Sequence, residues 1–223
     1  MSDKSSGITS LVLVAAAVTL VVTILRLVGE LQGLNAALFN TAAPGPDSQP
    51  GLFGITFLVP IFGFWFGWRL RRGTGGPTHA GKVALFYGLG ALVLVGGFMA
   101  AIYTELIVMP TKEAPGVPAG MAWVLGLVLT SIVVALAAWP RLSVALLVYA
   151  ILARIPVVAI TFLAVANGWD THYDKLAPNF AVPAGESKAV FLAMPQFTFW
   201  IAFTVLIGGV FGCLGAALAR RKS

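Results

Sequence analysis

Six long apolar segments decide what this chain can fold into, because each is long enough to cross a lipid bilayer. A helical span needs about 20 mostly apolar residues. The segments cover residues 8–28, 51–70, 83–109, 121–139, 142–168 and 189–218. Inside hydrocarbon a segment must satisfy its own backbone hydrogen bonds, which a continuous apolar run does as an α-helix. The sequence therefore predicts an all-α, polytopic integral membrane protein, in which residues 1–223 form a single domain of six transmembrane helices.

The composition supports this prediction and excludes several classes of protein. Hydrophobic residues make up 59% of the 223 residues and charged residues 10%, and the mean hydropathy is +0.94. Soluble domains are about 45–50% apolar and about 25% charged. So few charges cannot cover a soluble surface, which excludes an ordinary soluble enzyme, a disordered chain and a disulfide scaffold. The single cysteine, Cys213, lies in an apolar run, where we expect it to be a small packing residue.

The charges of the loops predict the orientation of the bundle. One set of loops and both termini carry nine basic residues, which are Lys4, Arg69, Arg71, Arg72, Lys82, Arg141, Arg220, Arg221 and Lys222. The opposite loops carry only Lys112, Lys175 and Lys188. Basic residues mark the cytoplasmic side, so we expect a multi-pass protein of the cell membrane with both termini cytoplasmic. The same rule explains the net charge of +6 without a nucleic-acid partner. The first segment is longer than the apolar core of about 7–15 residues in a signal peptide, so we expect it to remain as a span.

Arg154 is the most informative single residue. It lies twelve residues into the fifth segment, roughly 18 Å deep at the rise of a helix and near the bilayer midplane. An arginine there is costly and must face the bundle interior, water or a partner. One interpretation is a site for an anionic group, and the other is a structural pair or bonds to carbonyls freed by Pro156. Gln196, a polar position in the last segment, is a second candidate ligand-binding residue, with a bond between helices as its alternative.

Three more charged residues are predicted near the outer ends of the spans. Arg26 and Glu30 are four residues apart, so their side chains can pair on one face of a helix. Glu105 lies near the outer end of the third segment. Together they are candidates for one polar, ligand-binding cluster under the outer loops. The alternative is a rim of separate interfacial charges.

The loop after the fifth segment holds a candidate metal site. Asp170, His172 and Asp174 would share one face if this stretch were extended, because strand side chains alternate. Two carboxylates and an imidazole suit a divalent metal. The alternative is a solvated turn with capping aspartates. The sequence indicates no other cofactor.

Small residues recur at a spacing of four in three of the segments. They are Gly63 and Gly67, then Gly208, Gly212 and Ala216, and finally Ala84 and Gly88. Such spacing lets two helix backbones approach closely. We expect it to serve packing within the bundle, and the alternative is assembly into a homo-oligomer or a larger membrane complex. The lipid bilayer is the other predicted partner.

Three functions compete. The first is a small membrane protein that binds or transports a small polar or anionic solute, or a lipid headgroup, in a cavity around Arg154. The second is a non-catalytic structural or accessory subunit of a larger membrane complex, which fits the short loops and few buried polar groups. The third is a membrane-embedded enzyme with an outer-surface site around His172. The sequence contains no HExxH motif and no evident catalytic set, so a role without catalysis is favoured.

Overall fold

The computed structural model describes residues 3–43, 53–73, 75–114 and 119–219, and the regular elements of this part of the chain are all helices. The long helices are α1 (Asp3–Leu31), α2 (Leu58–Gly73), α3 (Ala80–Tyr103), α4 (Met121–Ala138), α5 (Pro140–Asn167), α6 (Lys188–Phe197) and α7 (Phe199–Leu218). Two short 3-10 helices, η1 (Ile55–Phe57) and η2 (His172–Asp174), lie in the loops. Within the described residues, β-structure is limited to two isolated bridges.

Five segments of the fold are long and apolar enough to cross a membrane. They are Ile8–Leu31, Ala80–Tyr103, Met121–Ala138, Pro140–Asn167 and the combined α6–α7 run Lys188–Leu218. The predicted long apolar helices are therefore confirmed, and five of these segments have the length and composition of membrane spans. The remaining helix, α2, has 16 residues, about 24 Å in length. It is shorter than the roughly 30 Å hydrocarbon core of a bilayer.

Two predicted segment ends were wrong. The second segment begins its α-helix at Leu58 instead of residue 51, and residues 51–52 lie outside the described part of the chain. This start places Pro60 in the first turn, where proline is tolerated. The third segment ends at Tyr103 instead of residue 109. Glu105 takes a left-handed backbone angle, φ 58°, which ends the helix and turns the chain into the next loop.

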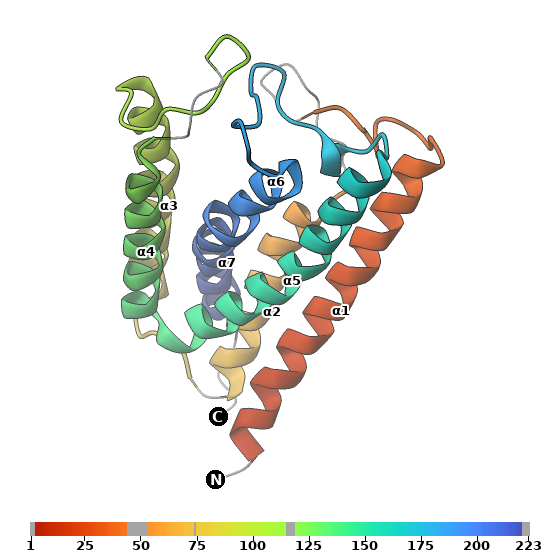
Figure 1. The fold of residues 1–223 in the computed structure, drawn as a ribbon. Helices are drawn as coiled ribbons and strands as arrows, with labels where there is room; N and C mark the ends of the chain where they lie inside the picture. The colour runs from red at the N-terminus through yellow and green to blue at the C-terminus, as the bar shows by residue number, and fades with distance from the viewer. Residues whose placement is uncertain (1–2, 44–52, 74, 115–118, 220–223) are drawn as a thin grey trace.

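The last segment was predicted as one span that Pro195 interrupts, and the structure divides it at Thr198. The backbone angles of Thr198, φ −113° and ψ −94°, are not helical. Pro195 lies three residues earlier and has no N–H to donate to the preceding turn. Two helices, α6 and α7, therefore meet end to end inside one membrane-spanning run (Figure 1).

Helix α7 is the centre of the bundle. It contacts every other α-helix except α1, which packs instead on α5 and α2. In Figure 1, α3 and α4 form a hairpin at one edge, and α1 follows α5 along the other edge. Figure 1 also places the start of α1 and the end of α7 at the same end of the bundle. We name this the basic end, because Arg71, Arg72 and Arg141 lie there, and the opposite end the loop end.

The predicted small-residue faces of α2 and α7 meet inside the chain. A Cβ atom on Gly63 would lie 2.6 Å from the Cα of Gly208, and one on Gly67 would lie 2.6 Å from the Cα of Gly212. Both distances are shorter than real Cβ contacts allow. All four glycines are buried. These faces are used for packing within the bundle, so they offer no surface to another chain.

Buried hydroxyl groups join neighbouring helices of the bundle. The Tyr87 and Ser143 hydroxyls are 2.6 Å apart and link α3 to α5, and Ser143 also donates to the Ala135 carbonyl. The Thr19 and Tyr149 hydroxyls are 3.0 Å apart and link α1 to α5. Bonds between polar side chains of neighbouring helices are a usual stabilising contact in membranes.

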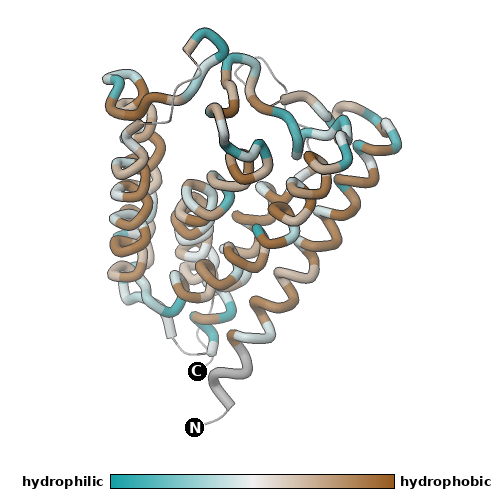
Figure 2. Tube along the Cα trace, viewed as in Figure 1, coloured by the Kyte–Doolittle hydropathy of each residue, from teal (hydrophilic) through white to brown (hydrophobic). Residues whose placement is uncertain are grey.

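The outward surfaces of the helices are apolar along their length. Figure 2 shows hydrophobic residues along the helices and hydrophilic residues gathered in the loops at both ends. Large side chains such as Leu92, Leu129 and Val133 are more than half exposed. Such surface belongs in contact with lipid. Cys213 is buried in the core cluster, as expected of a packing residue.

Candidate functional site

Arg154 lies at the middle of α5 and is buried inside the bundle. It is the fifteenth of 28 residues, about 20 Å from either end of the helix. Its exposed fraction is 4%. The Nη1 group donates to Gln196 Oε1 over 3.1 Å, and the guanidinium lies over the Trp200 ring, 5.1 Å from its centroid. The structure therefore brings together two of the predicted ligand-binding residues, Arg154 and Gln196.

The guanidinium of Arg154 is incompletely satisfied. Its buried Nε atom has no hydrogen-bond partner. Within the described part of the chain, no carboxylate pairs with it. An arginine in a protein remains protonated and has five N–H donors. A buried positive charge is thus in contact with one neutral amide and one aromatic face, and its Nε–H donor is unused.

The break in the last span lies beside this charge. Gln196 and Trp200 stand on either side of Thr198, one near the end of α6 and the other in the first turn of α7. The first N–H groups of a helix lack partners within the helix and carry a partial positive charge. The break therefore places the partial positive charge of the start of α7 and the partial negative charge of the end of α6 near Arg154. Discontinuous helices of this kind form substrate sites in many membrane transporters.

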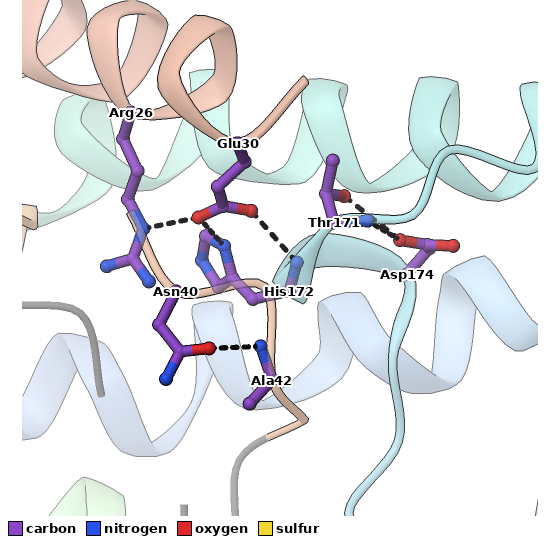
Figure 3. A network of polar contacts seen from close by, with 7 residues as sticks. All are labelled: Arg26, Glu30, Asn40, Ala42, Thr171, His172 and Asp174. Carbon is purple, nitrogen blue, oxygen red and sulfur yellow. Dashed lines mark hydrogen bonds and ion pairs between the residues drawn. The ribbon is translucent and has the colours of Figure 1, made fainter. Parts of the chain in front are cut away.

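A second polar network lies at the loop end, and it centres on Glu30. The side chain of Glu30 is fully buried. Its Oε1 accepts from Arg26 Nε over 2.8 Å and lies 2.6 Å from His172 Nδ1, while Oε2 accepts from the His172 backbone N–H over 2.9 Å. Figure 3 shows both α1 residues pointing toward the loop that follows α5. The network ties the end of α1 to that loop.

The three predicted metal ligands have separate partners. His172–Asp174 form a 3-10 turn instead of the extended strand that the metal interpretation required. Asp174 Oδ1 accepts from the backbone and hydroxyl of Thr171 as a capping box, and Asp170 pairs with Lys175 over 2.8 Å. Among the residues that the structure describes, no group of three potential ligands could hold a metal. The turn with a capping aspartate, the alternative in the sequence, is what forms.

Glu105 does not join the predicted outer cluster. It is exposed in the loop after α3, and the two helices that were expected to contribute, α1 and α3, do not touch. The predicted pair Arg26 and Glu30 does form. The cluster is thus a network of α1 with the loop after α5, and Glu105 is a separate surface charge.

Two contacts within these polar sites were not predicted from the sequence. Trp200 is not among the candidate residues named from the sequence, yet its ring faces Arg154. Glu30 and His172 are 142 residues apart, and nothing in their local spacing indicates that they meet. For Trp200, a signal was present: in the single span that the sequence predicted, an aromatic ring four residues after Gln196 would lie on the same helix face.

The His172 imidazole gives a test of this network by pH. Burial lowers the pKa of His172 below its usual value of 6.5, and the hydrogen bond to Glu30 opposes the shift without cancelling it. Arg26 also lowers this pKa, whereas Asp174 raises it. Below pH 6.5 the unfolded chain then binds more protons than the folded chain, so stability falls with acidification.

We expect the melting temperature in detergent to fall as the pH is lowered from 8 to below about 6.5, at roughly 2–4 °C for each kcal/mol lost. His172→Gln should remove part of this dependence. His79→Gln is the matched control, because His79 is the chain's other histidine and is exposed at the basic end. A melting temperature that rises on acidification would show that the folded state holds a protonated imidazole against Glu30.

No protein-family model matches the chain, and no curated protein or solved structure matches it. The choice of function therefore depends on the geometry of the two polar sites, one around Arg154 and one around Glu30.

Proposed function

We propose that the protein binds a small anionic solute, or an anionic lipid headgroup, at Arg154 and moves it through the membrane. The observation that carries this proposal is the buried guanidinium, whose Nε has no partner and which no described carboxylate neutralises. A charge in the membrane interior costs several kcal/mol unless it is paired. An anion beside Nε would supply both the missing acceptor and the missing countercharge.

The broken span supports transport in addition to binding. Thr198 separates α6 from α7 at the level where Gln196 and Trp200 meet Arg154. A bend there lets α6 move relative to α7 without unfolding either helix. Pro156 in α5 lies two residues beyond Arg154 and weakens the helical hydrogen bonding on the facing side. The anion would then be bound between two elements that can change their relative position.

The other two functions fit these contacts less well. In a subunit of a larger complex, a carboxylate of a neighbouring chain would have to reach Arg154, which is 4% exposed and inside the bundle. A small solute meets that requirement more easily. In an enzyme around His172, the imidazole would need a nucleophile or a substrate contact. His172 has no hydrogen bond to a serine, threonine or cysteine side chain among the described residues. A role without catalysis is therefore proposed.

The proposed location is the cell membrane, with both termini cytoplasmic. The start of α1 and the end of α7 both lie at the basic end of the bundle (Figure 1). The arginines of α2 and the start of α5 lie at the same end, and basic residues favour the cytoplasmic side.

The test is ligand-dependent stabilisation of purified protein in detergent, with sodium acetate, chloride and phosphate as probes at matched ionic strength. A ligand at a hundredfold excess over its Kd stabilises the folded state by about 2.7 kcal/mol. We expect at least one anion to raise the melting temperature of the wild type. Arg154→Leu should abolish the rise, and Arg154→Lys should weaken it because lysine lacks the planar fork of donors.

Lys82→Gln is the control, since it also removes one positive charge but lies at the start of α3 at the basic end. The proposal fails if Arg154→Leu responds to anions as the wild type does. It also fails if none of the three anions stabilises the wild type. In that case, co-purification with a second membrane protein that Arg154→Leu no longer retains would favour the subunit.

A further inference from the structure

All three lysines of the loop end converge on one hollow, although they lie far apart in the sequence. Lys112, Lys175 and Lys188 line a shallow, open hollow of about 360 Å³. Asp174 and Phe180 are among its other lining residues. The chain's other three lysines were predicted on the opposite side of the membrane. The three lysines of the hollow are therefore all those that the sequence assigns to the loop end.

The pairing of two loops produces this convergence. Thr111 and Phe180 form an antiparallel bridge, and the Ala181 N–H donates to the Pro110 carbonyl over 3.0 Å. The Lys112 N–H donates to the Asn179 carbonyl over 3.3 Å. The loop after α3 is thereby attached to the loop that carries Lys175. Lys188 enters the hollow from the first residue of α6.

The charge of the hollow is positive. Lys175 is paired with Asp170, and Asp174 keeps its negative charge although its Oδ1 accepts from Thr171, so the three lysines exceed these two carboxylates by one positive charge. Neither Lys112 nor Lys188 has an ion-pair partner within the part of the chain that the structure describes. Lys112 and Lys188 are exposed, so both ammonium groups remain available.

The start of α6 adds to this potential. Helix α6 has ten residues, and the side chain of its N-cap, Ser187, makes no capping hydrogen bond. The first N–H groups of α6 are left for another acceptor, beside the ammonium group of Lys188. Two unpaired ammonium groups and an uncapped helix start are chemistry that suits a phosphate group.

We propose that this lysine hollow binds a phosphate group at the loop end, either from a small phosphate-bearing solute or from a lipid headgroup. The hollow is separate from the site around Arg154: Lys188 opens α6, and Gln196 lies eight residues further along, about 12 Å into the bundle. The proposal does not rest on the function proposed for Arg154.

The experiment measures binding of inorganic phosphate to the purified full chain in nanodiscs of phosphatidylcholine. Four proteins are compared: wild type, Lys112→Gln/Lys188→Gln, Lys82→Gln and Arg154→Leu. We expect the double variant to weaken binding by at least about tenfold, and Lys82→Gln to bind as the wild type does. Both lysines of the double variant are exposed surface residues, so the variant should fold.

A second arm distinguishes the sources of the phosphate. In nanodiscs that contain phosphatidylglycerol, a hollow that holds headgroups should bind inorganic phosphate less tightly, because the lipid competes. A hollow that holds soluble phosphates should lose only the affinity that the negative surface removes, and this loss should disappear when salt screens the surface charge.

Three outcomes overturn the proposal. The first is binding by the double variant that equals the wild type. The second is the absence of inorganic-phosphate binding by the wild type in phosphatidylcholine nanodiscs. The third is a loss of phosphate binding in Arg154→Leu but not in the double variant, which would assign the phosphate to Arg154 and leave that proposed function standing. Conversely, if Arg154→Leu keeps phosphate binding and the double variant loses it, the hollow is established whatever the role of Arg154.

Discussion

Gly67→Ala should destabilise the protein sharply, although it adds only one methyl group. The new Cβ would lie 2.6 Å from the Cα of Gly212 and closer still to its carbonyl oxygen. Both contacts are with backbone, so no side chain can rotate away, and α2 must separate from α7. Overpacking in a tight core costs about 1–3 kcal/mol or more. We expect the melting temperature to fall by roughly 5–10 °C.

Gly88→Ala provides the matched control for this prediction. It makes the same chemical change in another helix, α3, and a Cβ at Gly88 would meet no atom within 4 Å. Alanine is the better helix former by up to about 1 kcal/mol, so Gly88→Ala should be neutral or stabilising. The measurement is thermal unfolding of both variants in the same detergent. Equal melting temperatures would show that the α2–α7 contact is looser than the structure has it.

Much of this fold could be predicted from the sequence, including a close contact at the glycines of α2. Apolar length located the five segments that are long enough to span, because a continuous apolar run satisfies its backbone in lipid as a helix. Pro140 opens α5 at a position where proline is favoured, and the predicted bounds of α4 and α5 are within two residues. The spacing of Gly63 and Gly67 predicted a close helix approach, and the structure adds which helix approaches.

The missing parts of the prediction depend on tertiary contacts. The span from Lys188 to Leu218 is apolar along its length. Pro195 alone did not predict a break at Thr198, because a membrane helix can also accommodate a proline as a kink. The break matters because it places Gln196 and Trp200 on either side of one turn, facing Arg154. Hydropathy describes a segment as a whole and cannot resolve such a local change of direction.

The two candidate sites were predictable to different degrees. Arg154 stands out in any sequence of this kind, because a charge at mid-span is costly and needs an explanation. The pair Arg26 and Glu30 follows from helical spacing alone. The contact of Glu30 with His172 spans 142 residues and depends on how the loop after α5 folds back over α1. The lysine hollow likewise depends on the bridge between two loops, which carries no signal in either loop.

Glu30→Gln should cost about 3–5 kcal/mol, the range for removing one partner of a buried ion pair. The Glu30 carboxylate is fully buried and bonds to Arg26, to the imidazole and to the backbone of His172. Glutamine keeps the size but removes the charge, so the Arg26 guanidinium, whose side chain is 15% exposed, loses its countercharge.

Unfolding of four variants tests this cost, and the matched control is Glu105→Gln. Glu105 is exposed, so its change should stay within about 0.5 kcal/mol of the wild type. The double variant Arg26→Gln/Glu30→Gln should be more stable than Glu30→Gln alone, because no unpaired charge remains. Arg26→Gln alone should also be destabilising, because it leaves the buried carboxylate with His172 as its remaining partner. If Glu30→Gln is no more destabilising than Glu105→Gln, the network does not fasten α1 to the loop after α5. The three contacts of Glu30 would then be consequences of a fold that packing alone maintains.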